Sequence, residues 1–460
     1  MAEQMIQHKE GEKVATQAIP TGYKLTEVGV IPQDWNVSML RDISSKITDG
    51  THDTPKPVIE GIPFLTAIHV KDGKIDFDGC YFLPESIHNE IYRRCNPEFG
   101  DILMVNIGSG TATTAVVNVD YEFSLKNVAL IKPNKENNGF YINYALSFSK
   151  NKIIDTILTG GAQPFLSLTQ IALLQVPVPS REEQTTIANV LSDTDALIVG
   201  LELLIAKKQA IKTATMQQLL TGRTRLPQFA LRPDGTLKGY KSSELGHIPE
   251  DWHEVSLSSV TKNIDAGVSV NSIDQLDAYG HGKHVLKTSC VNGGVFNCLE
   301  AKSIIPSDIG RAKCFPREGN IIVSRMNTPA LVGEIGYIEK SLPGYFLPDR
   351  LWQVSFREDA ELNTKWLMYV LAHPINAKKI KESATGTSNS MKNISKNAFL
   401  ALNFYKPNIE EQTAIATILS DMDSELNALK QKLAKARDVK QGMMQQLLTG
   451  RIRLPVEQVE

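Results

Sequence analysis

The sequence predicts an α+β protein with a pseudo-twofold internal repeat: two similar globular domains separated by two long helices that pair as an antiparallel coiled coil. Three observations lead to this fold class. Two blocks of sequence occur twice in the same order, the stretches between them have the short alternating runs of β-structure, and each copy ends in a long heptad-like segment. A repeat with similar ends and dissimilar middles is typical of one scaffold that carries two different binding modules.

The first repeated block opens each copy. Residues 22–35 (GYKLTEVGVIPQDW) return as residues 239–252 (GYKSSELGHIPEDW), an offset of 217. The second block closes each copy, and its last part, MQQLLTGR at 216–223, returns at 444–451, an offset of 228. The second middle is therefore 11 residues longer than the first. A tandem duplication followed by drift remains an alternative, although drift alone does not explain why the ends stay alike.

Seven segments follow from this repeat. The domain-sized segments 22–180 and 239–407 contain the middles, roughly 36–158 and 253–384, where short apolar runs alternate with Gly, Pro, Asn and Asp turns. One helix is expected to close each middle, at 141–158 and 364–382. Trp35 and Trp252 open the two middles as expected buried anchors. The remaining segments are an N-terminal extension, 1–21; a central helix, 181–222; a linker, 223–238; a C-terminal helix, 408–450; and a tail, 451–460.

Each closing segment predicts a long helix with an apolar seam. Each begins in an acidic Glu-Glu-Gln turn and ends at Gly222 or Gly450, where a left-handed cap is expected. A helix over 182–220 would be ~58 Å long at about 1.5 Å per residue. We expect the two helices to pair; packing of each helix on its own domain alone is the alternative. The seam is expected at Ile187, Leu197, Leu201, Leu204 and Ile211, with Leu191, Ile198, Ile205 and Leu219 widening it, and at Ile415, Leu419, Leu426, Leu429 and Leu433.

Composition narrows the class of protein. The 460 residues carry a formal net charge of -2, which excludes a uniformly basic nucleic-acid coat but allows local basic surfaces. Five cysteines without a CxxC pair, no secretory leader and no apolar run of about 18 residues indicate a soluble cytoplasmic protein without a membrane span. No P-loop, HExxH, GxSxG or zinc-type spacing occurs, so neither a catalytic nor a metal site is expected.

Taken together, these motifs resemble the specificity subunit of type I restriction-modification enzymes. The resemblance rests on the Gly-x-Ile-Pro-x-Asp-Trp opening, the variable middle and the Glu-Glu-Gln helix ending in Leu-Leu-Thr-Gly-Arg, all present twice between about residues 20 and 455. It implies a non-catalytic DNA reader with two target recognition domains, each binding one half of a bipartite, asymmetric sequence. It implies that the paired helices set the spacer between the halves.

The same resemblance implies several partners. Two modification subunits would methylate adenine with S-adenosylmethionine, and restriction subunits would use ATP and Mg to translocate and cut double-stranded DNA. No cofactor is expected in this chain itself. Two other classes stay open: a scaffold of two adhesion or carbohydrate-binding modules, and an enzyme that methylates or cleaves DNA by itself.

Base reading requires polar side chains on loops that can enter a groove of DNA. Arg325 and Arg350 are of interest because Arg makes bidentate contacts to guanine. The two recognition domains also differ in charge: residues 41–158 hold 12 Lys and Arg against 15 Asp and Glu, whereas residues 258–400 hold 17 against 13. The candidate DNA-binding residues are Thr51, His52, Ser109, Thr111 and Gln163 in the first domain and Arg325, Asn327, Arg350, Ser388, Asn389 and Lys392 in the second.

Overall fold

The computed structural model describes residues 19–157, 164–243, 246–386 and 390–455. The chain forms two compact units: unit 1 comprises the residues up to Glu202 and from Gln431 onward, and unit 2 comprises Leu203–Lys430. The boundaries of the units fall inside the two long helices, α6 (Arg181–Leu219) and α12 (Ile409–Leu447). Each unit therefore holds one globular domain together with one part of each long helix.

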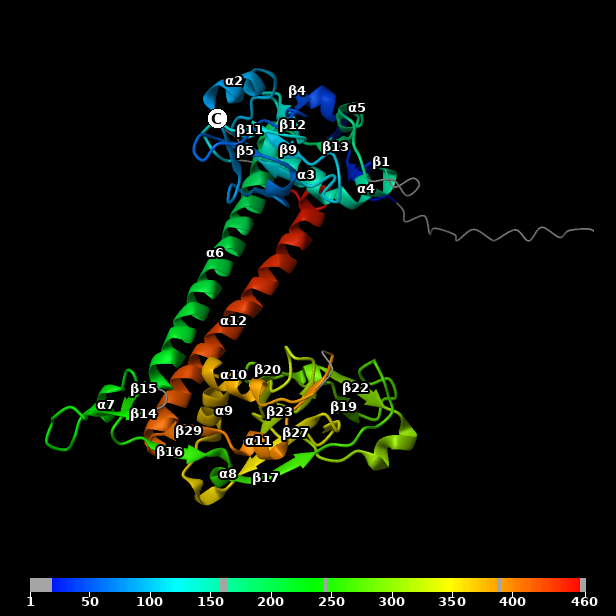
Figure 1. Cartoon of the computed structure of the whole chain (residues 1–460). Helices are drawn as coiled ribbons and strands as arrows, with labels where there is room; N and C mark the ends of the chain where they lie inside the picture. The colour runs from blue at the N-terminus through cyan, green and yellow to red at the C-terminus, as the bar shows by residue number, and fades with distance from the viewer. Residues whose placement is uncertain (1–18, 158–163, 244–245, 387–389, 456–460) are drawn as a thin grey trace, which may run out of the picture. The chain divides into compact units, whose positions relative to one another are not determined.

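Unit 1 is built around a four-stranded antiparallel sheet in the order β10-β9-β12-β4 (Figure 1). Successive side chains along a strand point to opposite faces of the sheet, and each face of this sheet packs into its own hydrophobic core. Ile102 and Met104 pack among helices, while Leu103 packs against a second, three-stranded sheet, β11-β5-β8. The four strands are β4 (Ser44–Asp49), β9 (Ile102–Met104), β10 (Thr114–Val116) and β12 (Ala129–Pro133).

The other elements of unit 1 surround this sheet. Two hairpins, β1-β2 and β6-β7, and the pair β13-β3 complete the strands. The strands are β1 (Tyr23–Thr26), β2 (Gly29–Pro32), β3 (Asn36–Met39), β5 (Ile62–Leu65), β6 (Val70–Lys71), β7 (Lys74–Ile75), β8 (Tyr81–Leu83), β11 (Ser124–Leu125) and β13 (Gln175–Val178). The helices are α1 (Leu40–Ile43), η1 (Ala67–His69), α2 (Glu85–Arg94), α3 (Gly139–Phe148), α4 (Lys150–Ile157) and α5 (Leu168–Ala172).

Unit 2 repeats this plan despite the divergent sequence of its middle. Its central sheet has the order β17-β27-β23-β25, which matches β4-β12-β9-β10 strand for strand. The pair β16-β29 corresponds to β3-β13, and the hairpins β14-β15 and β20-β21 correspond to β1-β2 and β6-β7. The four central strands are β17 (Thr261–Ala266), β23 (Ile321–Ser324), β25 (Ile335–Tyr337) and β27 (Leu351–Phe356).

The second domain differs mainly in its additional strands. A four-stranded sheet, β18-β22-β19-β26, stands where unit 1 has three strands. The strands are β14 (Tyr240–Ser243), β15 (Gly246–Pro249), β16 (His253–Ser256), β18 (Ser272–Ile273), β19 (His284–Leu286), β20 (Val291–Asn292), β21 (Val295–Phe296), β22 (Ala301–Ile304), β24 (Met326–Asn327), β26 (Tyr345–Phe346), β28 (Lys392–Asn393) and β29 (Asn403–Lys406). The helices are α7 (Pro227–Ala230), α8 (Leu257–Val260), η2 (Thr288–Cys290), η3 (Pro306–Arg311), η4 (Glu358–Ala360), α9 (Thr364–Ala372), α10 (Pro374–Glu382) and α11 (Lys396–Leu400).

The single closing helix expected in each middle is two helices, so this expectation was wrong in both units. In unit 1 the helix breaks at Ser149, between α3 and α4. In unit 2 it breaks at His373, which is extended at φ -60° and ψ 136° because Pro374 follows it. A residue before proline is disfavoured in the helical region, and proline is well suited to the first position of the next helix.

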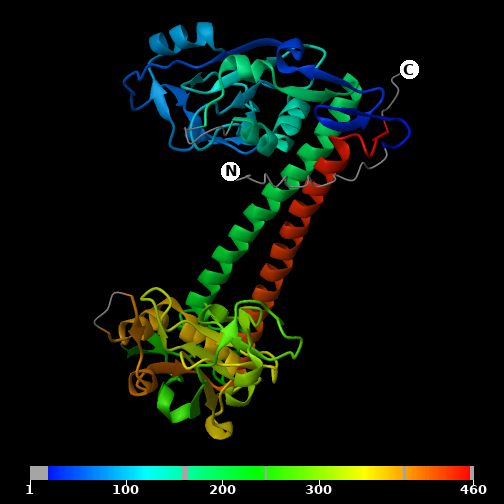
Figure 2. The ribbon, with the colours of Figure 1, turned by 90° about the vertical axis from the view of Figure 1, so that its right-hand side faces the viewer.

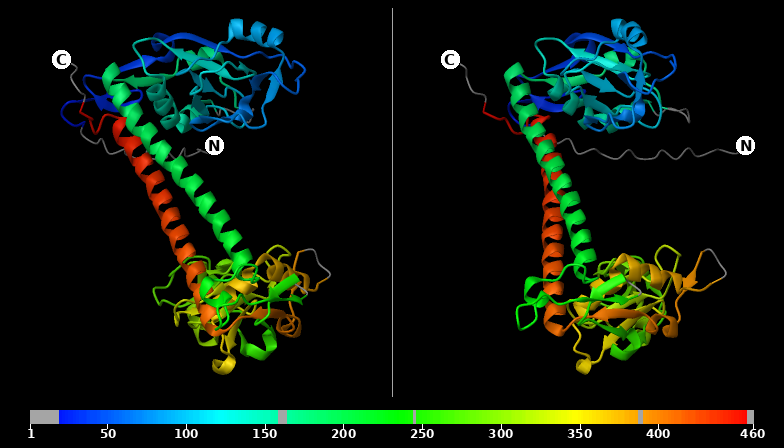
Figure 3. Two further views of the ribbon diagram at one scale, coloured as in Figure 1. Left: turned by 90° about the vertical axis from the view of Figure 1, so that its left-hand side faces the viewer. Right: turned by 60° about the vertical axis from the view of Figure 1, so that its left-hand side comes forward.

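The long helices run antiparallel within each unit (Figures 1, 2 and 3). In unit 1, Lys440 pairs with Asp195 and Arg437 with Glu202, each at 2.6 Å. In unit 2, Lys208 pairs with Glu425 at 2.7 Å and Lys212 pairs with Asp423. Residue numbers rise along one helix as they fall along the other. Ion pairs therefore cross between the helices in both units. No described helix has both the length and the apolarity needed to cross a membrane.

The buried face of α6 differs by one residue position from the expected seam over part of its length. Leu197, Leu204 and Ile211 are 48%, 38% and 42% exposed. The less exposed positions follow the stripe that begins at Leu191 and continues every three or four residues, including Lys208 and Lys212. These two lysines belong to the seam because α12 places carboxylates opposite them. Ile187, Leu201, Ile415, Leu419 and Leu426 are buried, and Leu429 and Leu433 are half-buried.

Candidate DNA interface

The loops that hold most of the candidate DNA-binding residues leave one edge of each central sheet. In unit 1, β4 ends at Asp49, which pairs with Ala129 at the start of β12, and Ala129 pairs with Met104 at the end of β9. Met104 also pairs with Thr114, the first residue of β10. Loops 50–61, 126–128 and 105–113 therefore meet at this edge, which we call the reading edge of unit 1.

Unit 2 has the same edge with other side chains. β17 ends at Ala266, which pairs with Trp352, and β23 ends at Ser324, which pairs with Leu351. The loops before β27, after β17 and between β23 and β25 meet there. A short ladder between β24 and β28 adds residues 392–393 to the same place. This is the reading edge of unit 2.

The candidates of unit 1 have different environments at their edge. His52 is exposed, with one ring nitrogen 2.8 Å from Oδ1 of Asn127 and the other 3.1 Å from Oδ2 of Asp49. Thr51 is half-buried and accepts a hydrogen bond from the backbone of Asp53, while Ser109 is exposed. Thr111 is 2% exposed, and its hydroxyl lies 2.7 Å from the Gly108 carbonyl oxygen, so in this conformation it shapes the loop and offers no surface to a base. Gln163 lies outside the described residues.

The two arginines of unit 2 have different environments. Arg325 donates from Nε to the Asp349 carbonyl at 2.7 Å and lies over the Trp352 ring at 5.8 Å. Its backbone nitrogen donates to the Arg350 carbonyl at 3.1 Å. Arg350 is exposed at the same turn. Arg325 thus fixes the main chain that carries Arg350, while the Arg350 side chain faces solvent.

The other candidates of unit 2 are held within their loops. Asn327 is 9% exposed; its amide nitrogen donates to Ser324 Oγ at 3.2 Å, and its Oδ1 accepts from the Thr328 backbone at 2.8 Å. Lys392 donates to the Gly386 carbonyl at 2.7 Å. Ser388 and Asn389 lie outside the described residues. Arg350 is therefore the described candidate of this edge that is both charged and exposed.

A clasp of four side chains joins the end of α12 to the opening block of unit 1. Arg453 donates from Nη1 and Nη2 to both carboxylate oxygens of Asp34, at 3.0 and 2.9 Å, and from Nη2 to Glu183 Oε2 at 2.8 Å. Trp35 donates from Nε1 to the same Glu183 oxygen at 3.1 Å. Glu183 is 3% exposed. The Glu-Glu-Gln turn, expected to interact with the helix dipole, thus supplies the buried anion of this clasp.

The same clasp recurs in unit 2. Arg225, which follows α6, donates to both oxygens of Glu411, at 2.7 and 2.6 Å, and to both oxygens of Asp251, at 2.8 and 3.2 Å. Trp252 donates to Glu411 at 3.4 Å. The Arg225 side chain is 4% exposed, whereas that of Arg453 is 43% exposed. The unit 2 clasp is the more buried of the two.

The clasps shift the pKa values of their carboxylates. The hydrogen bond from Arg453 holds the pKa of Asp34 below its ordinary value. Burial pushes the pKa of Asp251 upward, but hydrogen bonds from Arg225 and Lys238 outweigh it and leave that pKa lowered. Both carboxylates are therefore held in the charged form that the arginines need.

Glycine allows each long helix to end against a clasp. Gly222 and Gly450 have φ of +69° and +65°, the left-handed cap expected from the sequence. A Cβ on Gly222 would lie 2.4 Å from Cδ of Pro249, and one on Gly450 would lie 2.4 Å from Cγ of Pro32. The Pro and Trp of each opening block thus pack on a helix end. Trp35 and Trp252 are each 1% exposed, which confirms that they are buried anchors.

A second repeated set of side chains ties each domain to both helices. In unit 1, Tyr144 donates to Asp195 at 2.7 Å, and Lys440 lies 2.6 Å from Asp195 and 5.5 Å from the centre of the Tyr144 ring. In unit 2, Tyr369, Asp423 and Lys212 make the equivalent arrangement. Burial, followed by hydrogen bonding to the aspartate, raises the pKa of both tyrosines. We call these sets the Tyr-Asp-Lys triads.

Inspection of the sequence missed several of these residues. Arg225 and Arg453 lie at the 228-residue offset, two positions after the repeated block, so the signal was present. Arg225 is 186 residues from Glu411 and 26 from Asp251 in the sequence. Arg453 is 270 residues from Glu183 and 419 from Asp34. No local pattern indicates such pairs. Asn127, beside His52 at the reading edge, was also missed.

The fold and its clasps define a class: a duplicated binding protein whose two domains share one architecture and carry different loops at the same edge. Among the described residues, no group of three or more His, Cys, Asp or Glu is placed to hold a metal ion. The family model of the type I restriction modification DNA specificity domain matches residues 32–213 and again 249–436. The chain belongs to this family. It is thus a DNA-recognition component of a type I restriction-modification system.

Similar proteins cover almost the whole chain. The chain is 27% identical to a putative type I restriction enzyme MjaX specificity subunit of Methanocaldococcus jannaschii over 442 residues, 94% of this chain and 97% of that protein. It is 26% identical to the MjaVIII specificity subunit of the same organism, over 92% and 94% of the two chains. The crystal structure of the S subunit from M. genitalium has the same fold, with a TM-score of 0.58 and 14% identity over 90% of this chain and 96% of that one.

Proposed function

We propose that each domain reads one half of a bipartite, asymmetric DNA site through its reading edge. The observation that carries this proposal is one strand order in both central sheets with different side chains at the same edge. His52 and Asn127 offer donors and acceptors in unit 1, whereas Arg350 offers a guanidinium in unit 2. Such side chains distinguish bases by their hydrogen-bonding edges, so two different half-sites are expected.

We further propose that the paired helices set the unread spacer between the half-sites. The two helices are equally long, 39 residues each, and ion pairs join them in both units. A helix of that length measures about 58 Å at 1.5 Å per residue, against about 34–36 Å for one turn of DNA. The helix length corresponds to roughly 1.6–1.7 turns of DNA, and we expect the centres of the two half-sites to lie about one to one and a half turns apart, somewhat less than the full helix.

The chemistry is proposed to reside in partners. Two modification subunits would methylate adenine with S-adenosylmethionine, and restriction subunits would use ATP and Mg to move and cut DNA. This chain would dock them and supply the sequence specificity without a catalytic step of its own. We place the complex in the cytoplasm, a location with which the free cysteines Cys80, Cys95, Cys290, Cys298 and Cys314 are compatible.

Exchange of one domain tests the proposal. Residues 261–384 are replaced by the corresponding segment of another family member, and the genome of cells expressing the complete system is sequenced for methylated adenine. One half of the methylated motif should change, while the other half and the spacer stay the same. The matched exchange of residues 41–157 should change the opposite half. A motif that changes in both halves, or in neither, would contradict the assignment of one half-site to each domain.

The charge of the domains gives a second test of the same proposal. The near-neutral chain should bind DNA weakly alone and gain phosphate contacts from its partners, because counterion release scales with the number of basic contacts. Fluorescence anisotropy with a DNA duplex carrying the methylated motif should show tighter binding when modification subunits are added. If the added modification subunits leave the affinity for DNA unchanged, the proposal that the partners supply phosphate contacts is wrong.

A further inference from the structure

We propose that one further arginine at each reading edge reads a guanine: Arg94 in unit 1 and Arg311 in unit 2, each positioned by a nearly buried aspartate. The inference rests on the proposed function, because it takes the reading edges as DNA-binding surfaces. It adds one named side chain and one expected base to each half-site. The grounds are two ion pairs of the same form, brought to the two edges by equivalent segments of the fold.

Arg94 is the last residue of α2 and reaches the reading edge of unit 1 through Asp49, the last residue of β4. Its Nη2 donates to Oδ1 of Asp49. The other carboxylate oxygen, Oδ2, lies 3.1 Å from Nε2 of His52. Asp49 therefore joins a guanidinium from α2 to the loop 50–61, which leaves the same edge.

The main chain at Arg94 is fixed as well. Lys46 of β4 donates to the Arg94 carbonyl at 2.6 Å. The next residue, Cys95, is fully buried, and its backbone nitrogen donates to the Ile91 carbonyl at 3.0 Å. An arginine that is held at its main chain and at one side-chain nitrogen loses less conformational freedom when it binds DNA.

The counterpart of α2 in unit 2 is η3. It follows β22 as α2 follows β8, and both segments precede a Pro-x-x-Gly turn, at 97–100 and 316–319. Arg311, the last residue of η3, donates from Nη1 to Asp308 Oδ2 at 2.9 Å and from Nη2 to the Ser269 carbonyl at 3.3 Å. Ser269 lies in the loop after β17, so Arg311 stands at the reading edge of unit 2.

The two aspartates come from different elements. Asp49 ends β4, whereas Ala266 ends β17 at the matching position of the sheet. In unit 2 the carboxylate is Asp308, three residues before Arg311, and the backbone nitrogen of Asn271 donates to it at 2.8 Å. The exposed arginine recurs although its partner does not. This favours the arginine, and not the ion pair itself, as the feature that both edges need.

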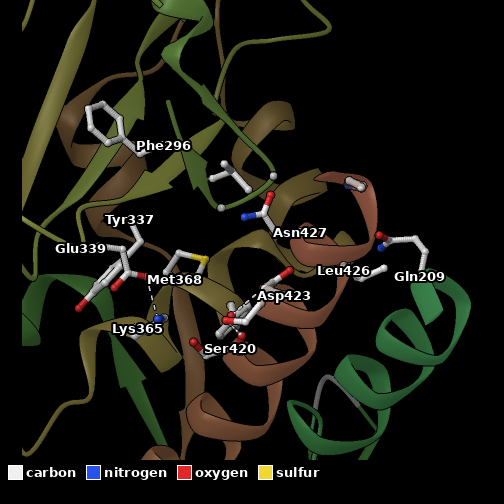
Figure 4. Close-up of a pocket in the computed structure, with 16 residues that line it drawn as sticks. Gln209, Phe296, Tyr337, Glu339, Lys365, Met368, Ser420, Asp423, Leu426 and Asn427 are labelled. Carbon is white, nitrogen blue, oxygen red and sulfur yellow. Dashed lines mark hydrogen bonds and ion pairs between the residues drawn. The ribbon is translucent and has the colours of Figure 1, made fainter. Parts of the chain in front are cut away.

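The exposure of the partners distinguishes these pairs from an ion pair that lines a groove of unit 2 (Figure 4). There the Lys365 side chain is 25% exposed and its partner Glu339 is 67% exposed. At the reading edges the order is reversed. Both arginine side chains are 57% exposed, against 8% and 11% for the aspartates. Each aspartate thus holds its guanidinium from below and leaves it accessible to a ligand.

A guanidinium held in this way keeps donors for a base. Arginine carries five N–H donors in a planar fork, and the aspartate occupies only part of them. Two donors of the fork match O6 and N7 of guanine in the major groove, which is the commonest specific contact of arginine. The aspartate also repels a phosphate group, because both are negatively charged. The arrangement therefore favours a base edge over the DNA backbone.

The test measures the methylated motif and DNA binding of the complete system. Arg94→Ala should relax one G·C pair in the half-site that follows residues 41–157, and Arg311→Ala one pair in the other half. In fluorescence anisotropy, the preference for guanine at that pair should fall roughly 5–150-fold. Arg93→Ala and Lys313→Ala are the matched controls and should change neither half. Both residues are exposed, and neither pairs with a carboxylate among the described residues. Thermal unfolding shows whether each variant is folded.

Lysine variants separate base reading from phosphate contact. Arg94→Lys and Arg311→Lys keep the charge and lose the fork, so the preference for guanine should fall while the affinity for DNA of unrelated sequence stays nearly unchanged.

Variants of Asp49 test its positioning role. Asp49→Ala introduces the residue that unit 2 has at this position, and it should relax the same base pair as Arg94→Ala. The double variant should discriminate no worse than Arg94→Ala alone, because the aspartate acts through the arginine. Asp49→Asn keeps an oxygen that can accept from Arg94, so it should recover part of the preference.

Two results would overturn the inference. In the first, either Arg→Ala variant leaves its own half-site and the preference for guanine unchanged. In the second, the Arg→Ala variants weaken binding to all duplexes equally and lysine restores it, which would assign the arginines to phosphate. A methylated motif in which neither half follows an exchanged domain would instead contradict the proposed function.

Discussion

Loss of the buried clasp arginine should destabilise unit 2 strongly. Arg225→Met leaves the Glu411 carboxylate, 2% exposed, with the indole of Trp252 as its remaining partner among the described side chains, whereas Asp251 keeps Lys238 at 2.8 Å. Stranding one buried partner of an ion pair costs about 3–5 kcal/mol. At ~2–4 °C per kcal/mol for a unit of this size, the unfolding temperature should fall by about 6–20 °C.

The equivalent change in unit 1 should cost less. Arg453 is 43% exposed, so water can reach the stranded Glu183 carboxylate when Arg453→Met removes its partner. With water replacing part of the lost contact, we expect a cost near that of an unsatisfied buried hydrogen-bonding group, about 1–3 kcal/mol. Differential scanning calorimetry of the two single variants should therefore rank Arg225→Met well below Arg453→Met in stability.

A double variant checks the cause of the loss. Glu411→Gln in the Arg225→Met background removes the stranded charge and leaves an oxygen that can still accept from Trp252. It should recover at least half of the lost unfolding temperature. The reasoning is refuted if Arg225→Met unfolds within about 1 °C of the wild type, a change of well under 1 kcal/mol, if Arg453→Met is the more damaging single change, or if the double variant is the least stable.

Three further predictions concern stability and specificity. Gly222→Ala should destabilise unit 2 by at least about 1–2 kcal/mol in urea unfolding, because its φ is +69°, whereas Gly200→Ala, in an open helical site, should stabilise by up to about 1 kcal/mol. Asp34, whose pKa is lowered, should contribute stability that is complete above its ordinary value of 3.8 and is lost as pH falls below it, so Asp34→Asn should flatten the acid limb of a stability–pH curve. Arg350→Ala should relax the specificity at one base pair of one methylated half-site, a pair expected to contain guanine, and should cost about 1–3 kcal/mol of DNA-binding free energy. Arg357→Ala, an exposed residue at the opposite end of β27, should leave the methylated motif unchanged.

The sequence predicted those features that depend on local pattern or on repetition. The duplicated plan follows from blocks that recur at offsets of 217 and 228 residues. The buried Trp35 and Trp252 and the left-handed caps at Gly222 and Gly450 follow from residues close together within those blocks. The similarity of the two central sheets did not follow residue by residue, because their middles share few side chains. It followed from the matching ends, which fix one architecture around both.

The features that were missed depend on partners distant in the sequence. The apolar stripe of α6 is broad, so Leu197, Leu204 and Ile211 were expected in the seam although they are exposed. Lys212 enters the seam instead, because Asp423 of α12 lies opposite it. A stripe on one helix cannot reveal the charges on the helix that covers it. The base-contacting residues are harder still to predict from the sequence, because the burial of Thr111 and Asn327 depends on loops that follow other strands.

The clasp of Arg453 has a consequence for synthesis of the chain. Unit 1 joins residues from the first and last parts of the sequence. The Tyr23 hydroxyl donates to the Gly450 carbonyl, 427 residues away. The carboxylate of Asp34 accepts a hydrogen bond from Arg453, which is synthesised 419 residues later. Unit 2 is continuous from Leu203 to Lys430. During translation the domain made second can therefore complete its contacts before the domain made first. Until the last helix emerges, the nascent unit 1 leaves Trp35 and part of its apolar core uncovered, which makes it the species most in need of protection from aggregation.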